Sequence, residues 1–279
     1  KVSKMSNAIS KAAVAAAMAL AFAACSDSDR ASADELYRQG EQAVESRNYQ
    51  GAITLLDTLN SRYPSQTEIR RKGLALRAKA MEGIAIDSIS AGDKALAEST
   101  IRVQELEPGF RKVESSVGLE GYYVPKDAPT EVMTATGIQP RVSEDGHFYL
   151  VANIQGRSIG LASLEFADGA ESVSTASISP SRVVAVEGSE SASFSPEDLE
   201  GVGAWLASHP GFGKCVARGS KGKTDIKISP RLREQILACY AYGSALQAHR
   251  LALVHREKYE RMLEAARNQM ANLTPVPEQ

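Results

Sequence analysis

The spacing of hydrophobic positions changes twice along this chain. Over residues 32–110, and again over 229–272, apolar residues recur at steps of three and four, which is the period of an amphipathic helix. Over residues 118–228, short segments alternate apolar and polar residues, which is the period of a β-strand. The pattern predicts an α+β protein with helical hairpins at the front, a small central antiparallel β-rich domain with one helix, and a long C-terminal helix.

The β-rich segment is divided by turn signals such as Asp145-Gly146 and Asp168-Gly169. Its one predicted helix has Ser195 as N-cap and Pro196 at the first helical position, and it ends near His209. The same Ser-Pro pair, Ser229-Pro230, begins the predicted C-terminal helix. Strands are predicted at residues 147–154, 158–166, 173–178, 182–186, 214–217 and 224–228.

The first 24 residues have the pattern of an export signal. Lys1, Lys4 and Lys11 occur there without any acidic residue, and thirteen apolar residues run from Ala12 to Ala24. A basic segment followed by an apolar run of this length is typical of a secretory signal peptide and too short to span a membrane. We therefore expect residues 1–24 to direct export and to be removed.

Cys25 follows this apolar run directly. The residues Phe22-Ala23-Ala24-Cys25 resemble the lipobox of bacterial lipoproteins, and the polar run SDSDR comes next. In that family the cysteine is acylated and becomes the mature N-terminus, so the resemblance implies lipidation of Cys25 and a tether over residues 25–31. Several acyl chains anchor a protein stably. Ser26, where aspartate would favour the inner membrane, indicates an outer-membrane lipoprotein facing the periplasm. The alternative is an ordinary secretory signal with a chance cysteine.

The segment from Glu35 to Pro64 is similar to one tetratricopeptide repeat. Small residues at Gly40 and Ala52 allow two antiparallel helices to pack closely, and Pro64 ends the second helix. A degenerate second pair is predicted, with one helix around Ile69–Ile84 and another from Asp93 to Glu107. The resemblance covers residues 32–108 and extends to the repeats of outer-membrane-assembly lipoproteins. The signature positions are Leu36, Gly40, Ala43, Tyr49, Ala52, Leu56, Leu59 and Pro64.

Tetratricopeptide grooves bind peptides or partner helices, so the resemblance implies a protein-interaction surface. By repeat position, its concave face holds Asp34, Tyr37, Glu41, Val44 and Glu45. Two repeats alone leave apolar surface uncovered. We expect the helix over 229–272 to cover the end or the groove of this region, or to pair with a second copy as a coiled coil.

Two short motifs suggest enzymes but lack the required context. Residues Ala217–Thr224 fit a loose phosphate-loop pattern, which needs a helix directly after it. The alternating residues Asp225–Ile228 predict a β-hairpin instead, so no nucleotide is expected at Lys223. Gly156–Gly160 matches the nucleophile elbow of α/β-hydrolases around Ser158, but a hairpin is again favoured over a strand-turn-helix.

The net charge, the remaining cysteines and the histidines bear on which partners and cofactors are expected. The net charge is −2, and removal of residues 1–24 makes it more negative, so no nucleic-acid partner is expected. Cys215 and Cys239 either form a disulfide in an oxidising periplasm or are buried free thiols, and both readings stay open. His249 and His255 lie six apart and cannot share a metal on one helix face, so no metal or cofactor is expected.

The sequence thus predicts a lipid-anchored cell-envelope scaffold that binds envelope proteins through its helices. An enzyme is disfavoured; its candidate forms are a hydrolase using Ser158 and a nucleotide enzyme using Lys223. A third hypothesis is a peptidoglycan- or carbohydrate-binding module in the β-rich domain. The chain has one tryptophan, Trp205, and few clustered aromatic residues, which argues against sugar stacking.

Overall fold

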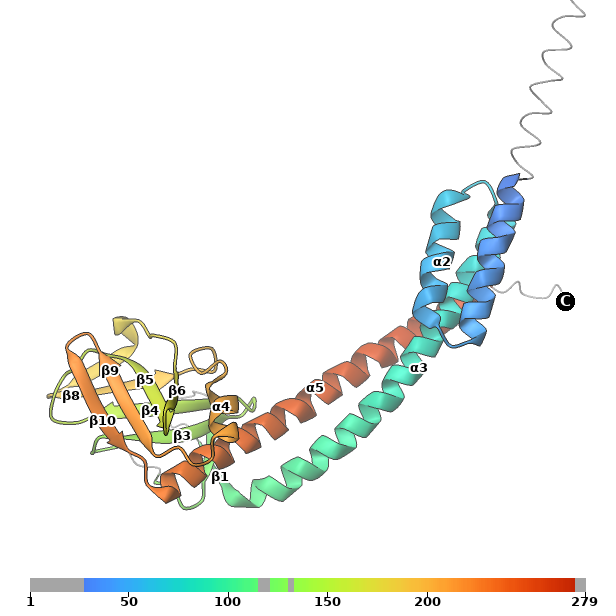
Figure 1. The fold of residues 1–279 in the computed structure, drawn as a ribbon. Helices are drawn as coiled ribbons and strands as arrows, with labels where there is room; N and C mark the ends of the chain where they lie inside the picture. Colours follow the sequence, from blue (N-terminus) through green and yellow to red (C-terminus); the bar gives the residue numbers. More distant parts are fainter. Residues whose placement is uncertain (1–27, 115–120, 130–132, 274–279) are drawn as a thin grey trace, which may run out of the picture. The chain divides into compact units, whose positions relative to one another are not determined.

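The computed structural model describes residues 28–114, 121–129 and 133–273 and confirms the predicted α+β layout (Figure 1). The chain forms two compact units. Among the described residues, the helical unit contains 28–93 and 254–273, and the β-rich unit contains those from 94 to 253. The predicted signal segment 1–24 and Cys25 lie outside the described residues.

The first two helices form the predicted hairpin of the helical unit. Helix α1 covers residues 28–45, and α2 runs from Tyr49–Arg62. Asn48 caps α2, because its side-chain oxygen accepts a hydrogen bond from the N–H of Gly51 at 3.1 Å. Ser32, which has capping-box spacing in the sequence, is already inside α1 and donates its hydroxyl to the carbonyl of Ser28 at 3.0 Å.

Helix α3, Thr67–Leu106, is one uninterrupted helix of 40 residues. The prediction of two helices with a break before Asp93 was wrong. The segment contains no proline, and Gly92 costs a helix only about 1 kcal/mol. Close packing offsets that cost, since a Cβ on Gly92 would lie 3.4 Å from Nδ1 of His255, on the last helix of the chain.

The last helix, α5, runs from Pro230–Leu273, close to the predicted range. Ser229 is its N-cap as predicted, because its hydroxyl accepts the N–H of Leu232 at 3.1 Å. Residues of α5 from 254 onward belong to the helical unit, and those before belong to the β-rich unit.

Within the helical unit, α5 packs against α3. Arg267 Nε lies 2.8 Å from Glu82 Oε1, and Arg256 Nε lies 3.3 Å from Asp93 Oδ1. Ala78 and Ala85 on α3 and Ala266 on α5 are fully buried. Such small side chains let two helices approach closely. This packing confirms the prediction that the C-terminal helix covers the repeat helices in the same chain.

The β-rich unit holds two antiparallel sheets with strand orders β1-β2-β3-β4-β8-β7 and β10-β9-β5-β6. The first sheet contains β1 Phe110–Val113, β2 Tyr122–Pro125, β3 Gly137–Ser143, β4 Phe148–Ile154, β8 Ser189–Phe194 and β7 Val183–Val186. The second sheet contains β10 Gly222–Lys227, β9 Lys214–Gly219, β5 Leu161–Asp168 and β6 Glu171–Ser174. Two 3-10 turns, Glu107–Gly109 and Pro180–Arg182, precede β1 and β7.

Four of these strands, β1, β2, β3 and β8, were not predicted. Strand β3 carries Pro140 in its middle, which argues against a central strand. Strand β8 reads SESASF, with too few apolar residues to stand out, although Glu190, Ala192 and Phe194 all face inward. Strand β1 lies at the end of the segment assigned to helices.

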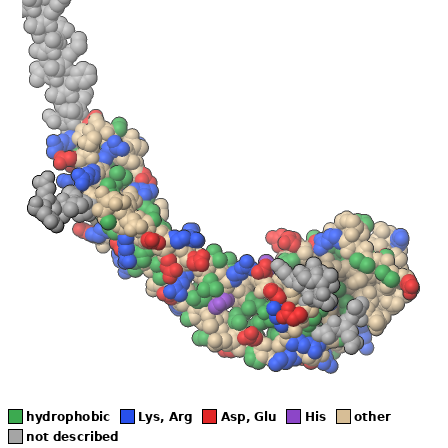
Figure 2. Space-filling model, turned by 180° about the vertical axis from the view of Figure 1, so that it is seen from behind, with side chains coloured by type: hydrophobic (Ala, Val, Ile, Leu, Met, Phe, Trp, Pro, Cys, Tyr) green, Lys and Arg blue, Asp and Glu red, His purple; other side chains and the backbone are tan. Residues whose placement is uncertain are grey.

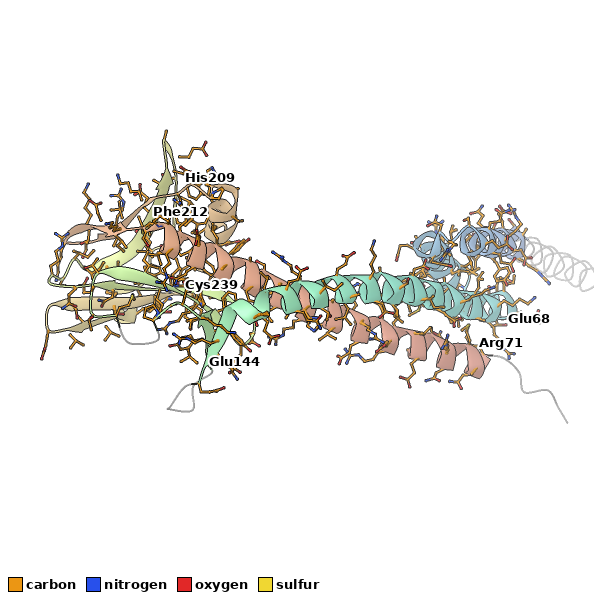
Figure 3. All side chains as sticks on the ribbon, turned by 90° about the horizontal axis from the view of Figure 1, so that it is seen from below. Glu68, Arg71, Glu144, His209, Phe212 and Cys239 are labelled. Atoms are coloured by element: carbon orange, nitrogen blue, oxygen red, sulfur yellow. The ribbon has the colours of Figure 1, made fainter. Side chains whose placement is uncertain are left out.

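A single large core joins both sheets to the first turns of α5. Ile236, Cys239 and Tyr242 of α5 are buried in it with Phe212, which precedes β9. Figure 3 labels Cys239 and Phe212. Burial of a large apolar side chain contributes about 1.5–3 kcal/mol, so this face of α5 is held firmly.

The short helix α4 spans Val202–Ser208, so it begins later than predicted. Asp198 lies in the hydrogen-bonded turns that precede α4, where its carboxylate accepts the N–H of Ser195 at 2.7 Å and pairs with Arg182 at 2.6 Å. Gly201 then adopts a left-handed conformation (φ 73°) immediately before the helix. The predicted end near His209 is confirmed.

Candidate interaction surfaces

Close contacts at glycines hold α1, α2 and α3 together in the helical unit. A Cβ on Gly40 would lie 3.0 Å from Leu56 Cδ2, and one on Gly83 would lie 2.4 Å from the Tyr49 ring. Gly40, Tyr49 and Leu56 are among the tetratricopeptide signature positions. The signature therefore corresponds to real helix–helix packing.

The five residues predicted for the concave face do not share one environment. Asp34, Glu41 and Glu45 are exposed, and Tyr37 is half-buried. Val44 is only 8% exposed and belongs to a hydrophobic cluster with Ala52 and Ala80. The accessible part of this face consists of three carboxylates around one tyrosine, which we call the α1 face.

Hydrogen bonds and burial fix the protonation states of Tyr37 and Glu35 on α1. Burial raises the pKa of Tyr37 to about 12, and hydrogen bonding to Glu41 adds to that shift. The phenol stays protonated and donates to the carboxylate. Beside this pair, hydrogen bonds from Arg38 and Gln39 lower the pKa of Glu35 to about 2. The helix therefore presents fixed negative charge at neutral pH.

Helix α5 also contacts the equivalent stretch of α3. Tetratricopeptide repeats recur about every 34 residues, so Arg71 and Ala78 correspond to Tyr37 and Val44. Arg71 donates to the carbonyl of Leu273 at 3.1 Å, and Ala78 is fully buried. Arg71 remains exposed, so these contacts place α5 along α3 without closing this stretch of it.

The phosphate-loop match lies on a β-hairpin, as predicted. Strands β9 and β10 pair with Gly219 opposite Gly222 and Arg218 opposite Lys223. The tight turn consists of Ser220 and Lys221, and no helix follows it. Without a helix N-terminus there is no cradle for phosphates at Lys223.

The hydrolase-like motif at Gly156–Gly160 also has a structural role. Strand β5 begins directly after it at Leu161, so no strand-turn-helix elbow exists. The hydroxyl of Ser158 donates to the buried carboxylate of Glu190, which also accepts the N–H groups of Ile159, Gly160 and Leu161, each at 3.0 Å. Ser158 serves to hold this loop.

The sequence pattern did not single out Glu190 as a structurally important residue. Burial would raise the pKa of Glu190, but hydrogen bonds from Ser158 and three backbone N–H groups outweigh it and lower that pKa. The only local signal was an acidic residue between serines in a weakly apolar stretch.

The contacts of the cysteines and of two histidines indicate structural roles. Cys215 and Cys239 are both free and buried, and burial raises the pKa of each thiol, which leaves them as neutral core residues. His147 Nδ1 lies 2.6 Å from Gln247 Nε2, and the His209 ring stacks on Trp205 at 4.1 Å. Among the described residues, no group of three His, Cys, Asp or Glu could hold a metal ion.

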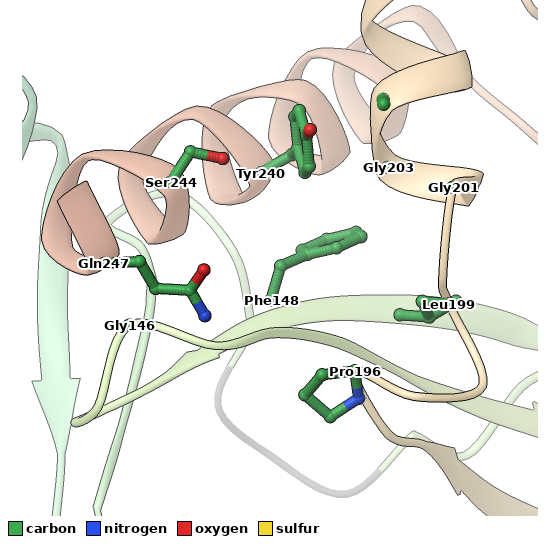
Figure 4. A pocket seen from close by; sticks show the side chains of 10 residues that line it. Gly146, Phe148, Pro196, Leu199, Gly201, Gly203, Tyr240, Ser244 and Gln247 are labelled. Atoms are coloured by element: carbon green, nitrogen blue, oxygen red, sulfur yellow. The ribbon is translucent and has the colours of Figure 1, made fainter. Parts of the chain in front are cut away.

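A small pocket lies between α4, α5 and the β3–β4 turn (Figure 4). Its volume is about 160 Å³, below the ~300–1,000 Å³ typical of small-molecule sites. Phe148 and Tyr240 meet edge to face in it, with ring centres 5.8 Å apart. The pocket is therefore better explained as a packing gap between core elements than as a substrate site.

Charged side chains of both signs are interspersed over the surface seen in Figure 2 and do not gather in one basic patch. Across the part of the chain that the structure describes, no helix is both long and apolar enough to cross a membrane.

Comparison with known protein families adds one match. The family model of the tetratricopeptide repeat matches residues 26–112. The front of the chain is therefore a tetratricopeptide-like repeat region, which supports a role as a protein-interaction scaffold. Comparisons with curated proteins and with solved structures gave no match.

Proposed function

We propose that this protein is a lipid-anchored scaffold of the cell envelope that binds a partner protein through the α1 face. The observation that carries the proposal is the exposed polar face of α1 within the tetratricopeptide-like region. Helix α5 contacts α3 at Arg71 and Glu82, whereas Asp34, Glu41 and Glu45 on α1 are exposed.

The chemistry of the α1 face defines the kind of partner. Three carboxylates favour a partner segment with basic residues, because complementary charges increase association rate and specificity. Tyr37 adds an aromatic surface fixed by its hydrogen bond to Glu41. Tyrosine is enriched where binding energy concentrates. A basic, extended or helical segment of another envelope protein fits these features.

The proposed anchor would bring this face close to a membrane. Helix α1 is already formed at residue 28. The chain from Cys25 to residue 28 spans at most about 10 Å. A lipidated Cys25 would therefore hold α1 near the outer-membrane surface on its periplasmic side, where a membrane-associated partner is within reach.

Site-specific cross-linking tests the interaction face. A photo-reactive amino acid at Glu41 should give a discrete cross-linked partner in intact cells, which Glu41→Lys combined with Glu45→Lys should weaken when the probe is at Asp34. The control position is Gln50, which is exposed on α2. Equal cross-linking from Gln50 and Glu41, or none from Glu41, would contradict the proposal.

Metabolic labelling tests the anchor separately. Labelled palmitate should enter the protein, and Cys25→Ser should abolish both the label and membrane association. Cys215→Ser is the matched control, because that thiol is buried in the β-rich core. Label that persists in Cys25→Ser would exclude lipidation at Cys25.

A further inference from the structure

A second concave surface lies wholly within the β-rich unit. It is a pocket of about 360 Å³ between the last turn of α3, the β1–β2 pair and the first turns of α5. Its volume is at the lower end of the range for small-molecule sites, which suits one long side chain and its neighbours.

The floor of this pocket is apolar and firmly supported. It is formed by Leu106, Phe110, Pro125 and Ala238. Phe110 stacks on Tyr242, with ring centres 4.3 Å apart and planes at 18°. Phe110 and Pro125 also face each other in the β1–β2 register. The floor is therefore continuous with the main core and is a preformed surface.

The rim of the pocket carries excess negative charge. Glu105 of α3, Asp127 after β2 and Glu234 of α5 line it, and Arg231 is the one cation among the lining residues. Glu105 already pairs with Arg102 at 3.0 Å. Arg231 is engaged, because its Nε lies 2.8 Å from Asp127 Oδ2. Glu234 takes part in none of the ion pairs found among the described residues.

Asp127 is held in its charged form. The amide of the buried Gln235 donates to Asp127 Oδ1 at 3.0 Å. Hydrogen bonds from Gln235 and Arg231 outweigh the effect of burial and lower the pKa of Asp127. The carboxylate thus stays ionised and oriented at the pocket edge, beside the accessible carboxylate of Glu234.

We infer that this pocket receives an arginine side chain from a partner protein. The apolar stem of arginine can lie on the floor while its charged head reaches the rim, as long basic side chains commonly do. Arginine suits the rim better than lysine, because its planar fork can bond to carboxylates from separate elements at once. This is a contact site in the β-rich unit, distinct from the α1 face, so it can fail or hold independently of the proposed function.

Binding of short peptides to the full chain tests this inference. The probe is a fluorescent, amidated peptide Gly-Leu-Arg-Leu-Gly, compared with the same peptide carrying glutamine in place of arginine. The arginine peptide should bind more tightly, on the order of tenfold, because charge-assisted hydrogen bonds are about twice as strong as neutral ones. Its affinity should fall as salt rises.

Two variants locate the binding. Glu234→Gln should weaken binding of the arginine peptide several-fold and leave the glutamine peptide unchanged. Ala238→Phe, which fills the floor, should abolish binding of both. The control is Glu264→Gln, an exposed glutamate of α5 in the helical unit. Thermal unfolding checks that each variant is folded. The inference is overturned if the arginine peptide does not bind, if both peptides bind equally, or if Glu234→Gln and Ala238→Phe retain wild-type affinity.

Discussion

At the scale of single residues, the most consequential side chain is Glu190. The residue is 3% exposed, and its carboxylate accepts four hydrogen bonds from residues 158–161. A buried charge is tolerated only when its hydrogen-bonding capacity is filled. Glu190 therefore ties the loop before β5, in one sheet, to β8 in the other.

Replacement of Glu190 should be strongly destabilising. Glu190→Ala leaves three backbone N–H groups and one hydroxyl without an acceptor, and we expect a loss of about 3 kcal/mol in the free energy of unfolding. Glu187→Ala is the control, because Glu187 is exposed in the adjacent β7–β8 turn. Chemical denaturation measures both. Similar stabilities for Glu190→Ala and wild type would contradict the assigned role.

The same carboxylate should make stability depend on pH. The pKa of Glu190 is lower in the folded chain than its ordinary value, so its contribution is complete above the unfolded pKa, about 4.3. It is lost as pH falls through the folded pKa. The stability difference between wild type and Glu190→Gln should therefore shrink as pH is lowered from 6 towards 3.

His209 should give the opposite dependence of stability on pH. The carbonyl of Trp205 and the carboxylate of Glu171, 2.9 Å from Nε2, raise the pKa of His209. Its contribution is complete below the unfolded pKa of about 6.5 and is lost as pH rises through the folded pKa. The advantage of wild type over His209→Gln should be larger at pH 5.5 than at pH 8.5. An advantage that grows with pH would show that the ring is not stabilised as a cation.

At the scale of elements, the sequence specified those whose signals are local. The hairpin at Ser220-Lys221, the cap at Ser229 and the helix pair before Pro64 each depend on a few adjacent residues, and all three were predicted. Strands β3 and β8 were missed because their inward side chains include Gln139 and Glu190. Tertiary hydrogen bonds satisfy those groups, and no pattern along the chain shows such partners.

The contact between α5 and the β3–β4 turn also joins residues that are far apart in the sequence. A Cβ on Gly146 would lie 2.7 Å from Cβ of Leu246 and 3.0 Å from the backbone nitrogen of Gln247, and the residue has φ +84°. Gly146→Ala should destabilise the protein by about 2–4 kcal/mol through overpacking and backbone strain.

Gly188→Ala separates these two causes. Gly188 has a similar φ of +80°, but a Cβ there would meet nothing within 4 Å. It should cost only about 1 kcal/mol, the strain of the left-handed conformation. Equal losses for both variants, measured by denaturation, would show that α5 does not constrain the turn.

At the scale of the whole chain, the sequence predicted the tetratricopeptide-like region but not the division of α5 between the two units. Leu253 belongs to the apolar pattern predicted over residues 229–272, yet it is 44% exposed, and Leu251 is 69% exposed. Near these residues, Gln247 and Arg250 of α5 bond to His147 and Asp145 of the β3–β4 turn, and the apolar side chains Leu251 and Leu253 face solvent. The acidic pocket above α5 was also missed, because Glu105, Asp127 and Glu234 come together only through the fold.

This division gives a prediction about the C-terminal helix. Ala266 is fully buried where α5 covers α3 in the helical unit. Ala266→Asp forces an unpaired charge into that contact, which should destabilise the helical unit by several kcal/mol. Limited proteolysis should then cut within residues 28–93 and spare the β-rich unit. The control is Lys258→Asp, because Lys258 is exposed on the same helix. If Ala266→Asp leaves residues 28–93 as resistant as in wild type, α5 does not close the repeat region, and the face of α3 is free for an external partner.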